Sequence, residues 1–344
     1  MRDTGKGVKH DRIFIKTSLR HGTNLKCGAS FLMKNHAGLT ISVLINTYNY
    51  RHYVGEAVAS ALNQTLAPSE VVVVDDGSTD GTAEWLRSEF AVHGSRVRVI
   101  SQPNAGQLAA IETAVASATG DLLFFLDADD TWAPDYLAAV HARLTSRPDV
   151  DYVLSSHIRS DGAPSEVLWE LNDRRLGRRS AQVYSTGKYP MSITSTLAMR
   201  ATLARRFLPT PLGMTSSWKT DADQILCLGA ALAGGGGEYL ASPRVHYRIH
   251  GANNFAGRVR LRNSATRLAR RERHDRAREA LVLRLGLSLD TVNLVAEEFT
   301  TIERPTWREF RRAVRTAVRA SFVREGIKLL ATIFLCYFSQ LPRK

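Results

Sequence analysis

The chain has few cysteines, and their positions exclude two common kinds of scaffold. Its three cysteines, Cys27, Cys227 and Cys336, are scattered along 344 residues, and no CxxC or His/Cys spacing accompanies them. An odd number of isolated cysteines argues against a disulfide framework, and the missing spacing argues against a structural zinc site. We therefore expect a reducing, cytoplasmic compartment.

Long apolar runs are also missing. The first residues contain no apolar core of the ~7–15 residues typical of a secretory signal, and no stretch approaches the ~20 apolar residues of a membrane-spanning helix. Internal repeats and low-complexity tracts are absent as well. We expect a globular protein long enough to bury a large core. Met33 stands just before the first predicted strand and is a candidate for the native start, which N-terminal sequencing would decide.

Acidic charge is scarce at both ends of the chain. Residues 1–38 hold 8 Lys or Arg against 2 Asp or Glu, and residues 257–344 hold 20 against 9. The block between them is slightly acidic, with 18 against 22, although the whole chain has a net charge of +13. The ends are therefore expected to meet different partners from the centre. We interpret residues 1–38 as a flexible basic segment and residues 257–344 as a basic helical region.

Strand and helix patterns alternate from residue 39 onward. Apolar runs predict strands at 40–46, 70–74, 96–100, 122–126, 150–155 and 239–249. Helical spacing predicts helices at 53–63, 79–90, 106–119, 134–145 and 218–233. Such alternation is typical of an α/β fold with a mostly parallel sheet and helices on both faces. The polar, Arg-rich stretch 160–185 is expected to be a loop.

Three carboxylates follow the apolar run 122–126, namely Asp127, Asp129 and Asp130. Ligands of open α/β sheets bind outside the carboxyl ends of the strands. A hard cation, Mg²⁺ or Mn²⁺, would relieve the repulsion among the carboxylates and carry a phosphorylated ligand. Alternatively, Asp129 or Asp130 caps the next helix, with Pro134 in its first turn. Capping needs only one carboxylate, so we favour the metal site.

Polar residues also follow two other predicted strands. Asn46, Thr47 and Tyr48 end the first strand, and Asp75 and Asp76 end the second. The first of these ends lacks the G-x-G-x-x-G of a dinucleotide site. Tyr48 can stack on a base and Asp76 can accept hydrogen bonds from base or ribose, although the second cluster also fits an ordinary turn. Three such clusters at the ends of parallel strands favour a nucleotide cleft.

Four stretches, in this order, make the chain resemble glycosyltransferase family 2, which has the GT-A fold. They are NTYN at 46–49, VVVVDDGSTDGT at 71–82, FLDADDTWAPDYL at 125–137 and HYRIHGANN at 246–254. The resemblance implies a GT-A domain at 39–256, with a nucleotide-binding half at 39–156 and an acceptor half at 157–256. It also implies transfer of a sugar from a UDP-, dTDP- or GDP-sugar to a saccharide or lipid-linked acceptor, with inversion, in surface polysaccharide or glycolipid synthesis.

The resemblance also assigns roles to single residues. It implies that the nucleotide-sugar is bound by Asn46, Thr47, Tyr48, Asp76, Asp127 and Asp129. It implies that the divalent metal, Mg²⁺ or Mn²⁺, lies at Asp129, Asp130 and His250. A carboxylate should take the proton from the acceptor hydroxyl. The family usually has Glu-Asp there, but this chain reads TDAD at 220–223, and the register favours Asp223 as the base over Asp221. A helix cap is the alternative for either residue.

The chain departs from the family directly after Asn104-Ala105-Gly106. Relatives carry an arginine there that reaches the nucleotide, whereas this chain has Gln107 and no arginine nearby. The resemblance therefore leaves the base and the sugar of the donor open.

The C-terminal region contains a short apolar segment beside clustered arginines. Residues 329–338 are apolar except for Thr332, which is too short a run to span a bilayer but suits an interfacial helix. Lys and Arg near the surface attract anionic lipid. Two interpretations stay open: peripheral attachment to the cytoplasmic membrane face through 257–344, or a helical pair in which 329–338 forms a core or dimer contact.

Two other functions fit parts of the sequence. Asp127, Asp129 and Thr131 also match the DxDxT of haloacid-dehalogenase-like phosphatases, but that motif normally follows the first strand of its domain. A nucleic-acid-binding protein without catalysis would explain the basic ends. The acidic central block and the lack of a nucleic-acid motif argue against it, so no nucleic-acid partner is expected.

Overall fold

The computed structural model describes residues 38–159, 172–250, 264–320 and 325–340. The chain divides into two units, Met1–Asn35 and His36–Lys344, and all described residues lie in the second. The segment expected to be flexible, residues 1–38, therefore lies outside the described residues apart from Gly38, and so does the candidate start at Met33.

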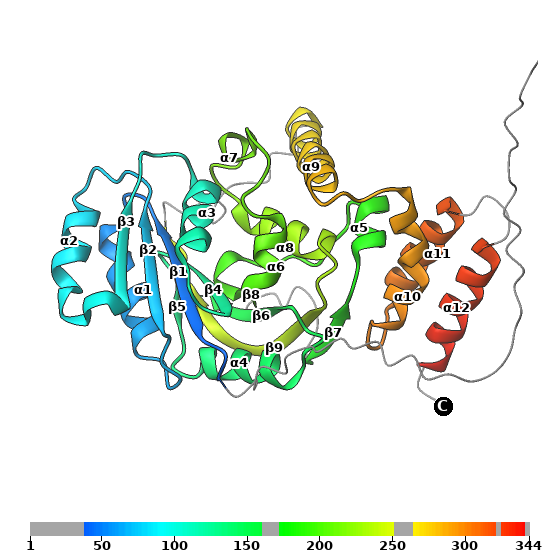
Figure 1. The fold of residues 1–344 in the computed structure, drawn as a ribbon, viewed down its shortest axis with the longest axis horizontal. Coiled ribbons are helices and arrows are strands. Elements are labelled where there is room, and N and C mark those ends of the chain that lie inside the picture. Colours follow the sequence, from blue (N-terminus) through cyan, green and yellow to red (C-terminus); the bar gives the residue numbers. More distant parts are fainter. Residues whose placement is uncertain (1–37, 160–171, 251–263, 321–324, 341–344) are drawn as a thin grey trace, which may run out of the picture. The chain divides into compact units, whose positions relative to one another are not determined.

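A nine-stranded sheet forms the centre of this unit (Figure 1). Its strands are β1 (Ile41–Thr47), β2 (Glu70–Asp75), β3 (Val97–Ser101), β4 (Leu122–Asp127), β5 (Thr131–Trp132), β6 (Tyr152–Arg159), β7 (Arg174–Gly177), β8 (Leu197–Arg200) and β9 (Gly237–Tyr247). The order is β3-β2-β1-β4-β8-β6-β9-β5, with β7 beside β9. Strands β1 to β4 are parallel, as are β6 and β9, whereas β5, β7 and β8 pair antiparallel. The predicted α/β class is confirmed, and the second half of the sheet is more mixed than the sequence indicated.

Helices cover both faces of the sheet. They are α1 (Arg51–Leu62), α2 (Thr82–Glu89), α3 (Gln107–Ser117), α4 (Tyr136–Ser146), α5 (Ser180–Thr186), α6 (Ala201–Phe207), α7 (Met214–Ser217) and α8 (Ala222–Leu232). In β4, Leu123 and Phe125 join the core under α3, α6 and α8, and Phe124 and Leu126 join the core under α1 and α4. A strand buried on both faces needs an unbroken apolar run, which is why this one was readable from the sequence.

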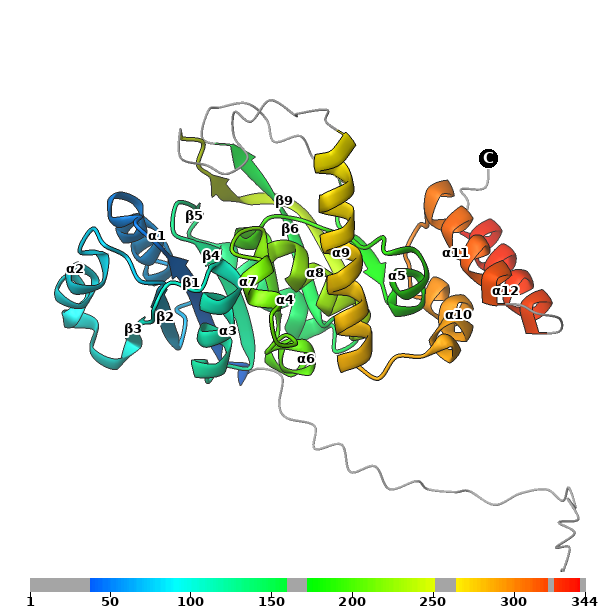
Figure 2. The ribbon, with the colours of Figure 1, turned by 90° about the horizontal axis from the view of Figure 1, so that it is seen from above.

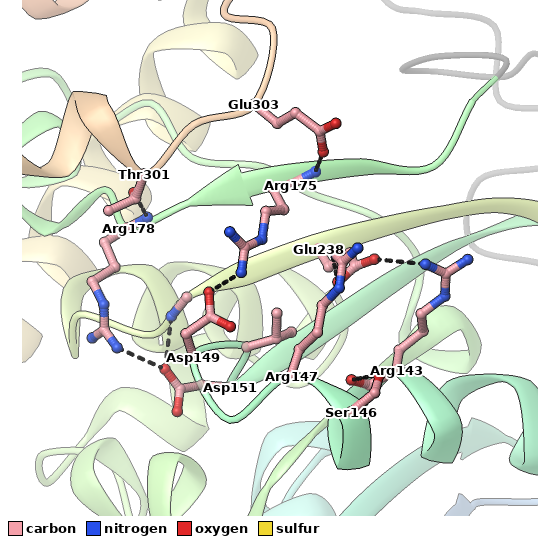
Figure 3. Close-up of polar contacts among 12 residues, drawn as sticks. Arg143, Ser146, Arg147, Asp149, Asp151, Arg175, Arg178, Glu238, Thr301 and Glu303 are labelled. Atoms are coloured by element: carbon pink, nitrogen blue, oxygen red, sulfur yellow. Dashed lines mark hydrogen bonds and ion pairs between the residues drawn. The ribbon is translucent and has the colours of Figure 1, made fainter. Parts of the chain in front are cut away.

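The expectation of a loop at 160–185 is wrong in its second part. Residues 160–171 lie outside the described residues, but β7 and α5 occupy the rest. The arginines of this stretch are neutralised by carboxylates distant in sequence: Arg175 pairs with Asp149, and Arg178 lies 3.5 Å from Asp151 (Figure 3). Burying an unpaired charge is costly, which is why an Arg-rich stretch is expected to be an exposed loop. Pairing the arginines with carboxylates lowers this cost and allows the stretch to form a strand.

The C-terminal region is helical, as predicted. Its helices are α9 (Ser264–Arg284), α10 (Val295–Thr300), α11 (Trp307–Ala320) and α12 (Glu325–Ser339). Ala277 and Leu281 of α9 are buried in the same core as α8, while α10 to α12 form a separate apolar cluster with Ala181 of α5. Figure 2 shows α9 running alongside α8, and α11 and α12 packed side by side. Within the described residues, no helix has the length and apolar character needed to cross a membrane.

Candidate active site

Three strand ends meet at one edge of the sheet and open onto a cavity of about 390 Å³. The register of β1 and β4 places Asn46 beside Asp127. The cavity is lined by every residue expected to bind the nucleotide-sugar and by both candidates for the base: Asn46, Thr47, Tyr48, Asp76, Asp127, Asp129, Asp221 and Asp223. Asp130 and His250, both expected at the metal, do not line it.

The end of β1 offers an unsatisfied hydroxyl and an aromatic ring. Thr47 is buried, and its Oγ1 has no hydrogen-bond partner in the described part of the chain. A buried hydroxyl without a partner is costly, so a polar ligand group in the cavity would satisfy it. Tyr48 is 45% exposed at the same place.

Asp76, which follows β2, already has hydrogen-bond partners within the protein. Its carboxylate accepts hydrogen bonds from Gln102 Nε2 and Gly106 N, each at 2.7 Å. Asp76 thus also shapes the loop before α3.

Asp127 and Asp129 lie in the turn that leaves β4. Burial, followed by the charge of Asp129, raises the pKa of Asp127 to about 7. Gln107 Nε2 donates a hydrogen bond to Asp127 Oδ1 at 2.9 Å. Carboxylates this close repel one another, and a cation bound beside them would reverse that effect.

Asp130 faces the protein interior instead of the cavity. It is 1% exposed, and its carboxylate accepts hydrogen bonds from Ser195 Oγ at 2.5 Å and from Arg248 N at 3.0 Å. Burial, then the charges of Asp129 and Asp127, raises the pKa of Asp130. The structure therefore gives Asp130 the geometry of an internal anchor for the turn, which differs from the metal contact expected from the sequence.

His250 lies directly against Asp129. Its Nε2 is 3.0 Å from Asp129 Oδ2, and its ring stacks on Tyr53 with 4.7 Å between centroids. Arg248 Nε donates to the carbonyl oxygen of Asp129 at 2.9 Å, so the segment after β9 is docked on the β4 turn. No three His, Cys, Asp or Glu side chains are grouped for metal binding within the described ranges. One carboxylate and one imidazole nevertheless fit a cation that takes its remaining ligands from phosphate and water.

The two candidates for the base differ in their surroundings. Asp223 lies in the first turn of α8, and burial, then the charges of Asp127 and Asp221, raises its pKa to about 7. Asp221 stands at the N-cap position of that helix without a capping hydrogen bond from its side chain, and its Oδ2 lies 2.7 Å from Arg273 Nη2 of α9. The guanidinium of Arg273 thus already occupies one carboxylate oxygen of Asp221. The geometry therefore favours Asp223 between the two.

Sequence reasoning did not single out three residues that organise these carboxylates. Gln107 bridges the two halves of the cleft, because its Nε2 donates to Asp127 and its Oε1 accepts from Ala222 N at 3.1 Å. Ser195 donates to Asp130, and Arg273 pairs with Asp221. Only Gln107 had a signal in the sequence, as the residue that follows the Asn-Ala-Gly segment in place of an arginine.

Known proteins with similar sequences are glycosyltransferases and polysaccharide synthases. The sequence model of Glycosyl transferase family 2 matches residues 42–207. An uncharacterized glycosyltransferase of Nostoc sp. is 32% identical over 228 residues, covering 63% of this chain and 66% of that protein. Chondroitin synthase of Escherichia coli is 45% identical over 95 residues, covering 28% of this chain and 14% of the synthase. The chain thus spans less than two thirds of either relative.

A likeness to a solved structure extends over more of the chain. The crystal structure of S. aureus TarS 1-349 in complex with UDP-GlcNAc superposes with a TM-score of 0.52 at 18% identity, covering 87% of this chain and 82% of that one. At this identity the likeness shows the fold alone.

Proposed function

Because the chain belongs to glycosyltransferase family 2 and has its GT-A fold, we propose that it transfers a sugar from a nucleotide-sugar to an acceptor hydroxyl with inversion. The observation that carries this proposal is the single cavity at the sheet edge. It joins the unsatisfied Thr47 hydroxyl, the carboxylates of Asp127 and Asp129, and the half-buried Asp223. The donor is a UDP-, dTDP- or GDP-sugar.

The nucleoside binds at the ends of β1 and β2. Tyr48 stacks on the base, Thr47 Oγ1 gains the partner that it lacks, and Asn46 and Asp76 complete the polar wall. Asp127, held by Gln107 and beside Asn46, lines the cavity where the ribose binds. No positively charged side chain stands at 107, although Lys219 also lines the cavity. A carboxylate repels phosphate, so Asp129 would hold the diphosphate only through a divalent cation.

Asp129 and His250 would hold a divalent cation, Mg²⁺ or Mn²⁺, and such an ion would neutralise the charge that develops on the departing nucleoside diphosphate. Asp130 supports this pair indirectly, because its carboxylate accepts a hydrogen bond from Arg248 N in the segment that carries His250.

Asp223 acts as the base. Its carboxylate accepts the proton of the acceptor hydroxyl, and the hydroxyl oxygen then forms a bond to the anomeric carbon. The bond from that carbon to the diphosphate oxygen breaks on the opposite face, so the configuration inverts. A pKa near 7 suits this role, since a base works best when its pKa is close to the operating pH.

The first test is donor hydrolysis across a panel of nucleotide-sugars, with and without Mn²⁺. Wild type should release nucleoside diphosphate from one donor in a metal-dependent way, and Asp129→Asn should lose that activity. Asp149→Asn is the matched control, because Asp149 is an exposed carboxylate remote from the cavity. If wild type neither hydrolyses any donor nor binds nucleoside diphosphate in calorimetry, the proposal is wrong.

The phosphatase alternative has less support in the fold. Three strands, β1 to β3, precede the carboxylate turn after β4, whereas the phosphatase motif normally follows the first strand. The phosphatase alternative would be supported if wild type hydrolysed an aryl phosphate and Asp127→Asn did not. Nucleic-acid binding would explain neither the cavity nor its carboxylates.

The acceptor and the location are proposed from the C-terminal helices and the relatives. Chondroitin synthase is a relative, which favours polysaccharide or glycolipid synthesis for this chain. Large apolar side chains are exposed on α11 and α12, namely Trp307, Phe334, Leu335 and Phe338. Arg308, Arg311 and Arg315 are exposed on α11. Apolar side chains beside arginines suit an anionic cytoplasmic membrane face, where a lipid-linked acceptor would be found.

A further inference from the structure

The segment that carries the base is contacted by a helix from the C-terminal region. Arg273 of α9 places its Nη2 2.7 Å from Asp221 Oδ2, and its Nη1 lies 3.5 Å from the carbonyl oxygen of Ser217. The guanidinium also lies 4.0 Å from the ring centroid of Trp218, which is itself buried. One arginine therefore touches three residues of the stretch that leads into α8.

The same segment is held from its other side by α3. Gln107 N donates to the carbonyl oxygen of Lys219 at 2.9 Å, and Gln107 Oε1 accepts from Ala222 N. The two backbone segments pass so closely that a Cβ on Gly106 would lie 2.6 Å from Lys219 Cα. Residues 217–222 are thus clamped between α3, from the nucleotide half, and α9, from the C-terminal region.

The backbone of Asp221 needs such a clamp. Its φ is +67°, in the left-handed region that residues with a Cβ rarely adopt. Strained conformations of this kind persist only where the surrounding structure fixes them. Asp221 makes the turn after which Asp223 enters the cavity, so the contact that fixes Asp221 also sets the position of Asp223.

We propose that Arg273 is a positioning residue of the transfer reaction, which holds Asp221 in its turn so that Asp223 faces the acceptor. The inference rests on the proposed function. It makes α9 part of the catalytic unit, although the sequence motifs of the family end before this helix. Asp221 is then the partner of Arg273 and takes no proton itself.

The test compares Arg273→Gln, Arg273→Lys, Asp221→Asn and the double variant Arg273→Gln with Asp221→Asn. Arg271→Gln is the matched control, because Arg271 lies on the same helix, is 82% exposed and pairs only with Asp275 among the described ion pairs. The readouts are kcat and KM for hydrolysis of the donor that the screen identifies, the Kd for its nucleoside diphosphate, and Tm.

Arg273→Gln should lower kcat by about tenfold, since small displacements of a catalytic group are costly. Donor KM and the Kd of the nucleoside diphosphate should stay within about twofold, because the donor binds elsewhere in the cavity. Arg273→Lys keeps the charge but not the stacked, forked geometry, so it should recover part of kcat. Asp221→Asn should resemble Arg273→Gln, and the double variant should be no worse than either.

Several results would overturn the inference. They are an Arg273→Gln variant as active as wild type, a loss equalled by Arg271→Gln, additive losses in the double variant, or a lower Tm with no effect on kcat in the folded protein. Complete loss in Asp221→Asn with full activity in Arg273→Gln would make Asp221 the base. A wild type that turns over no donor would instead refute the proposed function, and this inference with it.

Discussion

Asp223 and Asp127 lie in one cavity, and burial raises the pKa of each to about 7. The base must be deprotonated to accept a proton, so a raised pKa means that activity is lost as the pH falls through about 7. We predict that kcat/KM for the donor is level above about pH 8 and falls below about pH 7. A cation bound at Asp129 would keep Asp127 charged, so this acidic limb should follow a single protonation, that of Asp223. A pH–rate profile from pH 5 to 9 measures it.

Asp223→Asn is the companion variant. It should lower kcat by about 10²–10⁴-fold, the usual contribution of a general base, while the affinity for nucleoside diphosphate is retained. Its residual activity should lose this acidic limb. A wild-type profile that is flat between pH 5 and 8, or an Asp223→Asn variant with normal kcat, would contradict the assignment.

At the residue scale, the sequence predicted which residues lie together where this follows directly from strand register. Asn46 and Asp127 had to meet, because parallel strands end at the same edge of the sheet. The orientation of Asp130 could not be predicted, since it depends on Ser195, which lies 65 positions away. The pairing of Arg273 with Asp221 spans 52 positions and belongs to no motif.

At the scale of elements, β7 and α5 are fastened to α11 through one buried carboxylate. Glu309 lies 2.6 Å from Arg174 and also pairs with Arg179, and all three residues are buried. Burial raises the pKa of Glu309, but Arg179 and Arg174 outweigh it and lower the pKa from 4.5 to about 2. A carboxyl with a depressed folded pKa contributes stability above its unfolded pKa. That contribution is lost as the pH falls from about 4.5 towards 2.

We predict that Glu309→Gln destabilises the fold by about 3–5 kcal/mol at pH 7, because two buried guanidinium groups lose their counter-charge. Urea unfolding followed by circular dichroism measures the difference. The gap to wild type should narrow as the pH falls from about 4.5 towards 2, because Glu309 is protonated first in the unfolded chain and only near pH 2 in the folded one. Glu297→Gln, an exposed change nearby, should stay within about 0.5 kcal/mol. Equal effects of the two variants would refute the role of Glu309.

This pairing explains why the sequence did not predict β7 and α5, although it predicted the parallel strands of the sheet. The strands β1, β2 and β4 are apolar runs that need no partner to be recognised. In contrast, β7 reads Arg-Arg-Leu-Gly, and Arg174 is stabilised by a glutamate 135 positions later. A polar stretch of that kind becomes a strand only when the distant carboxylate is present.

At the scale of the whole molecule, the apolar side chains of α12 are partly buried and partly exposed. The helix packs on α11, where Tyr337 stacks on Phe310 with 4.5 Å between ring centroids, and Ile333 is fully buried. Phe334 and Phe338 also lie near the Phe310 ring but stay 44% and 57% exposed, and Leu335 is 73% exposed. The open alternatives for residues 329–338 are therefore not exclusive, since the helix contributes a core contact and still leaves apolar side chains exposed. Helices α11 and α12 lie side by side (Figure 1).

We predict that this exposed surface binds anionic bilayers. Wild type should co-float with vesicles containing phosphatidylserine at low salt and should be released as the ionic strength rises, because electrostatic attraction is screened over about 10 Å at 0.1 M salt. Leu335→Glu should abolish flotation without lowering Tm, since Leu335 is 73% exposed and its replacement leaves every basic residue in place. Val92→Glu is the matched control, because Val92 is 86% exposed on the catalytic half, and this variant should float like wild type.

The basic N-terminal segment is present in all three proteins, so attraction through that segment alone would leave Leu335→Glu bound and would refute the assignment to α12. A different result would show that the surface is a contact between two copies of the chain. In that case wild type would sediment as a dimer and would not float, and Leu335→Glu would sediment as a monomer.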